Sequence, residues 1–140
     1  MIALTFVNIN ESELLPTFLD HHARQGVDAF VAMDMGSEDG SVDYLRSRTD
    51  LDIHLIDINP EQTRQAARRR DRMADYARTQ LQADWIVHSD CEEYWTVDDG
   101  RLSDYLSQLE PESHRAILVE RRNHFASRSA LDHYMQLQSR

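Results

Sequence analysis

The sequence predicts an α/β fold of three layers, in which helices cover both faces of a mostly parallel central sheet. Apolar runs with strand character alternate with helical patterns along most of the chain, and polar clusters follow the strands. The length of 140 residues, with 41% hydrophobic residues, suits one domain with its own core. We therefore expect residues 1–140 to form a single domain that binds its ligand beyond the carboxyl ends of the strands.

The expected elements follow one another in strand–helix order. Apolar runs bounded by turn residues predict strands at residues 2–7, 27–33, 53–58, 85–89 and 115–120. Apolar residues at helical spacing predict helices at residues 10–25 (with caps at 10–13), 42–48, 61–82 and 102–109, and the tail is expected to end in a helix from residue 129. Gly26 is a natural stop for the first helix, and Pro60 helps to close the third strand.

Composition narrows the classes of protein to consider. A net charge of −10 argues against general affinity for nucleic acid or anionic membranes, so an anionic ligand would need a local cation or a helix N-terminus. No apolar run approaches the length of a transmembrane segment, and the N-terminus lacks the pattern of a signal peptide. The one cysteine, Cys91, excludes an internal disulfide framework and fits a reducing compartment. We expect a cytoplasmic protein without a nucleic-acid partner.

The segment from Trp85 to Trp95 is the strongest chemical signal. An apolar run leads directly into a group of carboxylates, which are costly at the end of a buried strand unless a positive charge accompanies them. Asp90 and Glu92 alternate with Cys91, so in an extended chain they would point to the same side. Hard oxygen ligands suit Mg²⁺ or Mn²⁺, and this arrangement favours a metal–diphosphate site. A solvated acidic turn is the alternative.

The loop at residues 34–41 is the second candidate. Its glycines permit unusual backbone turns, and its carboxylates and amides could hydrogen-bond a nucleobase or ribose. Asp34, directly after the predicted strand at 27–33, is a candidate nucleotide ligand. Asp39 is another, although we favour capping of the next helix for Asp39 and Ser41.

Cations and histidines complete the candidates. The arginine-rich helix at 61–82 is chiefly interpreted as a solvated face with internal ion pairs. The sharper alternative is that Arg72, or Arg69, reaches a diphosphate, since arginine recognises phosphate in a bidentate way. His124 follows the predicted fifth strand and could approach a metal, although a lone loop histidine is usually a surface residue. Tyr94 and Trp95 could stack on a sugar or belong to the core.

Three motifs in order carry a family resemblance. They are Asn10-Glu11 with His21-His22 and Gly26-Val27-Asp28, the loop from Asp34 to Ser41, and the segment from Ala83 to Trp95. This set resembles the glycosyltransferase family 2 group, in the branch whose fourth-strand motif runs D-x-D-E-F. The resemblance extends from Thr5 to about Phe125 and includes Arg122-Asn123-His124-Phe125.

The resemblance implies a Rossmann-like GT-A fold, a nucleotide-sugar donor, a hydroxyl acceptor such as a saccharide, and a divalent cation. Asp34 would then contact the nucleoside and Glu11 would lie near the nucleotide. Asp90 would lie near the ribose or metal, Glu92 would ligate metal and diphosphate, and Glu93 would match the accessory acid that follows. The catalytic base is not identified by the resemblance.

Two departures from the family pattern keep other functions open. Glu92 stands where aspartate is usual, and the acceptor-binding half of the family is largely absent, so the chain is expected to be a truncated domain. A non-catalytic nucleotide-binding or interaction module is therefore the main alternative, and a metal-dependent phosphohydrolase or nucleotidyltransferase is a third. A sheet edge left uncovered by the absent half would favour a homodimer.

Overall fold

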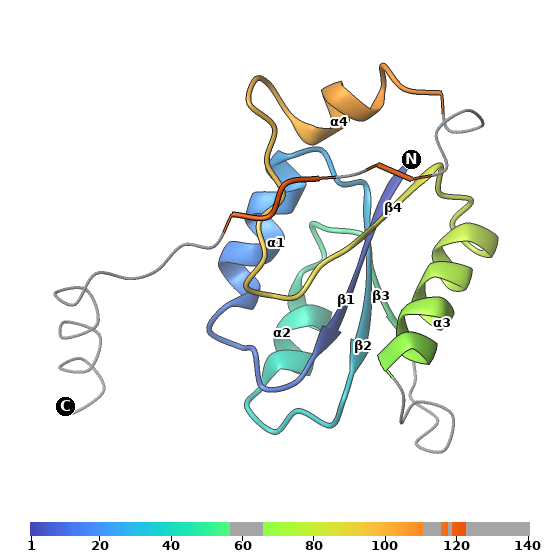
Figure 1. Cartoon of the computed structure of the whole chain (residues 1–140). Coiled ribbons are helices and arrows are strands. Elements are labelled where there is room, and N and C mark those ends of the chain that lie inside the picture. The colour runs from blue at the N-terminus through green and yellow to red at the C-terminus, as the bar shows by residue number, and fades with distance from the viewer. Residues whose placement is uncertain (57–65, 111–115, 118, 123–140) are drawn as a thin grey trace, which may run out of the picture.

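The structure, a computed structural model, describes residues 1–56, 66–110, 116–117 and 119–122. Its centre is a sheet of four parallel strands in the order β3-β2-β1-β4 (Figure 1). The strands are β1 (Ile2–Asn8), β2 (Ala29–Asp34), β3 (Ile53–Ile56) and β4 (Trp85–His88). An α/β fold with a parallel sheet was predicted, and the structure confirms it.

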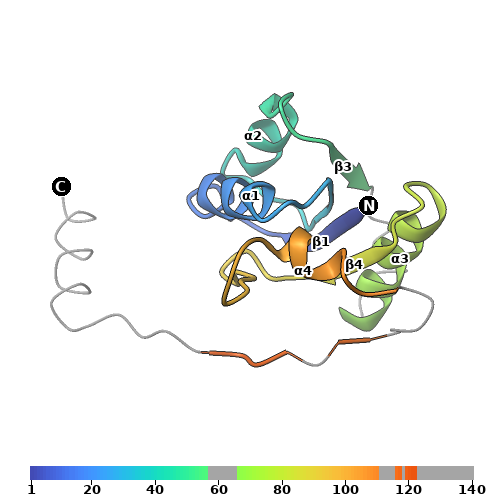
Figure 2. The ribbon, with the colours of Figure 1, turned by 90° about the horizontal axis from the view of Figure 1, so that it is seen from above.

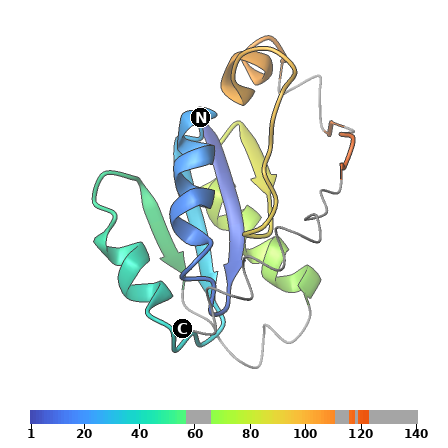
Figure 3. The same cartoon turned by 90° about the vertical axis from the view of Figure 1, so that its left-hand side faces the viewer.

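Helices cover both faces of this sheet. The helices are α1 (Leu15–Arg24), α2 (Ser41–Ser47), α3 (Ala66–Thr79) and α4 (Leu102–Leu106). Figures 2 and 3 show α1 and α2 on one side of the strands and α3 on the other. Among the described residues, no helix is both long and apolar enough to cross a membrane.

The two cores follow from the alternation of side chains along β1. Ile2, Leu4 and Phe6 face α1 and α2, and the ring of Phe6 meets that of Phe18 edge to face at 5.1 Å between centroids. Ala3 lies on the opposite face, in a smaller core with residues of α3. Because both faces of the central strands are buried, these strands are apolar almost without interruption, as parallel sheets require.

Several predicted boundaries differ from those observed. The first helix begins at Leu15, after a turn in which Glu11 O accepts the backbone N–H groups of Leu14 and Leu15. Within the described residues, α3 runs from 66 to 79 and ends before the predicted residue 82, where Gln82 adopts a left-handed backbone conformation with φ of 56°. The remainder of that predicted helix, residues 61–65, lies outside the described residues.

The predicted fifth strand is wrong for the part of it that is described. Residues 116–117 and 119–120 have no strand conformation. Ile117 packs against the larger core, but Val119 is 51% exposed. A short apolar run cannot reveal by itself whether a neighbouring strand will pair with it. The predicted tail helix and His124 lie outside the described residues.

Candidate functional site

The strand order changes direction at β1, and this marks one place along the carboxyl edge of the sheet. The chain proceeds from β1 through β2 to β3 on one side, and then crosses so that β4 lies on the other side of β1. In open α/β sheets, ligands bind at such a change of direction, beyond the carboxyl ends of the strands. The loops after β1, β2 and β4 begin there, and all three contain the predicted site residues.

Glu11, in the loop after β1, is affected by three carboxylates from the loops after β2 and β4. Partial burial raises the pKa of Glu11, and the negative charges of Glu92, Asp39 and Asp90 raise it further. Repulsion of this kind acts only over short distances, so the loops after β1, β2 and β4 bring their acids together. The strand order makes these acids, up to 81 positions apart in the sequence, neighbours in space.

The carboxylate of Asp34 accepts hydrogen bonds from the loop that it begins and from Asn8. One oxygen accepts the backbone N–H groups of Gly36 and Ser37 at 2.9 and 3.0 Å, and the other accepts the Asn8 amide at 2.7 Å and the Ser37 hydroxyl. Burial alone would raise the pKa of Asp34, but these hydrogen bonds outweigh it and lower the pKa below its usual value. Asp34 therefore stays ionised and shapes the loop.

Asn8, the last residue of β1, is a site residue that lies outside the predicted motifs. Its side chain is fully buried, and its Nδ2 donates to Asp34 and to the Ser37 hydroxyl. Its Oδ1 has no hydrogen-bond partner in the described structure. An unpaired buried carbonyl is uncommon and destabilising, which makes Asn8 a candidate acceptor for a ligand or water.

Asp39 links the loop after β2 to the starts of α1 and α2. Its carboxylate accepts the N–H of Ser12 at 2.8 Å, the N–H of Ser41 at 3.0 Å and the Ser41 hydroxyl. The Ser41 hydroxyl is the main cause that holds the pKa of Asp39 well below its usual range. The N-cap of α2 is Gly40, without a side-chain cap hydrogen bond, so Asp39 is not the cap that was predicted. It lies one residue earlier and holds the first residue of α2, Ser41.

The acidic segment after β4 is a turn, so the extended geometry used to align Asp90 with Glu92 is wrong. Glu93 N donates to Asp90 O at 2.9 Å, and Asp90 N donates to the Glu93 carboxylate at 3.2 Å. Glu93 also pairs with Arg121 at 3.0 Å, a partner that no local sequence pattern indicated. With the rest of the described chain, the carboxylates of Asp90 and Glu92 make neither hydrogen bonds nor ion pairs, and both residues are exposed.

Cys91 attaches this turn to the larger core and to the end of β1. The residue is buried, and its Sγ lies 3.8 Å from Val7 O. Burial, followed by the charges of Glu11, Glu92 and Asp90, raises its pKa to about 12. The thiol is therefore a packing group with little nucleophilic character.

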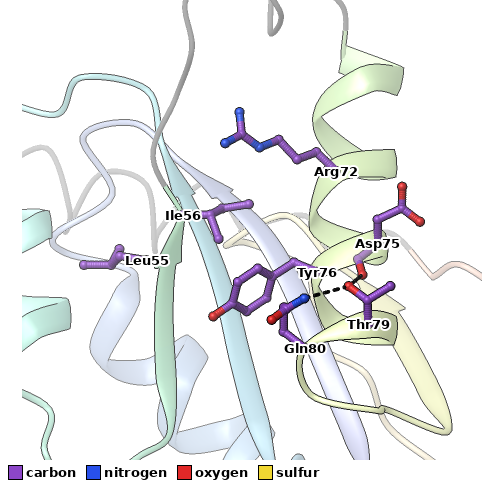
Figure 4. A pocket seen from close by; sticks show the side chains of 7 residues that line it. All are labelled: Leu55, Ile56, Arg72, Asp75, Tyr76, Thr79 and Gln80. Carbon is purple, nitrogen blue, oxygen red and sulfur yellow. Dashed lines mark hydrogen bonds between the residues drawn. The ribbon is translucent and has the colours of Figure 1, made fainter.

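Arg72 lies on the β3 side of α3, away from the acidic turn after β4. It lines a groove of about 470 Å³ between α3 and β3, and Figure 4 shows Arg72 and Tyr76 both extending toward β3. The guanidinium group forms no hydrogen bond or ion pair with any described residue. With respect to the described residues, Arg72 is thus an unpaired cation beside the end of β3, one strand away from the loop that Asp34 begins.

Arg70 is the α3 arginine whose charge reaches the end of β4. Burial lowers the pKa of His88, and the positive charge of Arg70 lowers it further. Arg70 is itself exposed, so its charge acts on His88 from the surface of α3. The predictions named Arg72 and Arg69 instead, because helical spacing alone does not distinguish these neighbouring arginines.

The carboxylates at this edge of the sheet supply only part of a metal-binding site. Among the described residues, no group of three or more His, Cys, Asp or Glu side chains is arranged to hold a metal ion. Asp90 and Glu92 nevertheless supply hard oxygen ligands in an exposed turn. Mg²⁺ commonly binds through one or two carboxylates together with water and substrate phosphates, so a shared site of this kind requires no complete protein cage.

Comparison with known proteins adds no relative to this description, since no family model, curated protein or solved structure matches the chain.

Proposed function

We propose that this chain is a nucleotide-sugar-binding domain of a metal-dependent glycosyltransferase of the family 2 type. The observation that carries the proposal is the convergence of Glu11, Asp90 and Glu92 at the carboxyl edge of a parallel sheet. Their order along the chain is that of the motifs described above, and the place is where α/β sheets bind nucleotides.

In this proposal Asp90 and Glu92 hold a divalent cation together with the diphosphate of the donor. When bound, such a cation neutralises the diphosphate leaving group as the bond to the sugar breaks. Among the described residues the two carboxylates form no ion pair, and Arg121, the cation at this turn, is already paired with Glu93. An anionic ligand would therefore be repelled from Asp90 and Glu92 without a metal. The negative net charge of the chain makes this requirement stronger.

The loop after β2 would contact the nucleoside through its backbone. Asn8, at the end of β1, would contact it through its side chain. Asp34 and Asp39 act in this proposal by holding the loop in shape, because their oxygens already accept hydrogen bonds. The unpaired Oδ1 of Asn8 would accept a hydrogen bond from the nucleoside or a bridging water. Arg70 and Arg72 are the candidate protein cations for phosphate.

Calorimetry with UDP and GDP tests the proposal. We expect binding in the presence of Mn²⁺, and at least a tenfold weakening on addition of EDTA or on Asp90→Ala. The matched control is Asp99→Ala, which removes another exposed acid a few residues further along the chain. Equal affinity with Mn²⁺, with EDTA and for Asp90→Ala would overturn the metal-dependent site.

A non-catalytic nucleotide-binding module remains the second candidate, favoured by the glutamate at position 92 where the family pattern has aspartate. The two candidates differ in turnover. Hydrolysis or transfer of a sugar nucleotide above the level of Glu92→Ala would favour the enzyme, and binding without turnover would favour the module.

A further inference from the structure

Two adjacent histidines on α1 hold the backbone of a single residue beyond the acidic turn. His21 Nε2 lies 2.8 Å from Trp95 O, and His22 Nε2 accepts the Trp95 N–H at 3.2 Å. His22 Nδ1 lies 2.9 Å from Phe18 O, one helical turn earlier. Both hydrogen-bonding groups of the Trp95 backbone are thus satisfied by one helix.

These contacts specify the protonation of both rings. Because His22 Nε2 accepts a hydrogen bond from the Trp95 N–H, the ring proton of His22 lies on Nδ1, which donates a hydrogen bond to Phe18 O. Burial is the main cause that lowers the pKa of His22, to about 4, so the ring is neutral near pH 7. His21 must carry a proton on Nε2 in order to donate to the Trp95 carbonyl.

Tyr94 strengthens the same attachment. Its ring centroid lies 5.1 Å from that of His21 in an edge-to-face contact and 6.1 Å from that of His22 in a stacked one. The chain at 94–95 is therefore held by ring packing as well as by hydrogen bonds. At the other end of the acidic turn, Ser89 N donates to Thr5 O of β1 at 3.1 Å.

The acidic turn is thus held at both of its ends, by the end of β4 on one side and by the histidine pair on the other. The same helix that carries the pair begins from the turn formed by Glu11, whose carbonyl accepts Leu15 N at 3.0 Å. One rigid element therefore relates Glu11 to the turn that contains Asp90 and Glu92.

We propose that His21 and His22 are positioning residues that fix the Asp90–Glu92 turn relative to Glu11 by holding the backbone of Trp95. This inference rests on the proposed function, because its consequence for binding requires that the turn take a metal and a nucleotide. The pair touches neither ligand and acts only through residues 94 and 95.

Ring-preserving variants separate the hydrogen bonds from the packing. His21→Phe and His22→Phe keep an aromatic ring beside Tyr94 but remove the ring nitrogens. We expect amide hydrogen exchange in residues 90–95 to accelerate at least tenfold and Mn²⁺-dependent UDP binding to weaken at least tenfold. His21→Gln lacks the ring but retains a donor for the Trp95 carbonyl. It should restore much of the exchange protection and much of the UDP affinity, whereas no recovery is expected if ring packing alone holds the turn.

His54→Phe is the matched control. His54 is another partly buried histidine with a hydrogen bond, from Nδ1 to the Tyr76 hydroxyl at 3.1 Å, but it lies on the edge strand β3. The His54→Phe variant should leave amide exchange in residues 90–95 and the affinity for UDP unchanged. Since His22→Phe removes buried hydrogen bonds and could unfold the chain, His21→Phe, at a half-buried position, keeps the test decisive.

The outcomes distinguish this inference from the proposed function. Unchanged exchange in residues 90–95 of His21→Phe would overturn the positioning role, as would faster exchange with unaltered UDP affinity. Absence of Mn²⁺-dependent binding by the unmodified chain would defeat the proposed function instead. In that case the exchange measurement alone still decides whether the histidine pair holds the turn.

Discussion

Asn8 and Asp34 stand opposite each other at the ends of the two central strands, and the amide of Asn8 donates to the carboxylate of Asp34 at 2.7 Å. This bond ties the loop after β1 to the loop after β2. The same carboxylate accepts three further hydrogen bonds from Gly36 and Ser37, which hold the start of the loop after β2 in place. The shape of the candidate nucleoside loop therefore depends on one ionised carboxylate surrounded by donors.

Replacing that carboxylate by an amide should destabilise the fold. In Asp34→Asn one acceptor oxygen becomes an NH₂ group that faces existing donors, and the charge is lost. We expect the free energy of unfolding to fall by about 1–3 kcal/mol, as for other buried polar groups left unpaired. Urea denaturation measures it. Asp43→Asn, at an exposed position of α2, is the control and should change stability by less than about 0.5 kcal/mol.

Stability should decrease on mild acidification because of His22. The folded chain keeps His22 neutral to about pH 4, whereas the unfolded chain takes up a proton near the ordinary value of 6.5. The stabilisation is complete above pH 6.5 and is lost as the pH falls toward 4, by roughly 3 kcal/mol at most. Urea unfolding between pH 7 and pH 5 should show this slope.

The same series with His22→Phe identifies the source of the slope. Glu11, whose raised pKa contributes the opposite trend at lower pH, is present in both proteins and cancels in the comparison. A slope of equal size in the variant would assign the acid sensitivity to other groups.

Gly26 should be less replaceable than Gly36 and Gly40, although all three have positive φ. A methyl group at Gly26 would lie 2.2 Å from the Ser103 hydroxyl oxygen and 2.4 Å from its Cβ, so α4 would have to move. Gly36 and Gly40 also have positive φ but have open space around them. Replacing either by alanine should cost about 1 kcal/mol of backbone strain.

Gly26→Ala should therefore cost clearly more than Gly36→Ala or Gly40→Ala in thermal unfolding. Removing the obstruction provides a second check, because Ser103→Gly combined with Gly26→Ala should recover the excess and leave only the strain. Three equal losses would show that α4 does not approach Gly26 in solution.

The thiol of Cys91 should be unreactive while the chain is folded. Its burial and its pKa of about 12 keep both the thiolate fraction and the access of reagents low. Iodoacetamide at pH 8 should label the chain only above the urea concentration at which it unfolds. Rapid labelling in the absence of urea would contradict the buried position of Cys91.

The sequence by itself determined the class of fold. Alternating apolar runs and helical patterns reveal which segments become strands and helices, because those periodicities are local properties of the chain. They located β1 to β4 to within a few residues and showed that the polar clusters follow the strands. They failed at residues 115–120, where an apolar run was expected to be a strand although no paired neighbour was specified.

The tertiary structure decided which side chains meet. Asn8 reaches Asp34 because β1 and β2 are neighbours in register, and His21 and His22 reach Trp95 because the chain after β4 returns along α1. The position of Arg72 beside β3 also depends on how α3 lies across the sheet. Contacts of this kind join residues far apart in the chain, and only the crossovers and packing of whole elements bring them together.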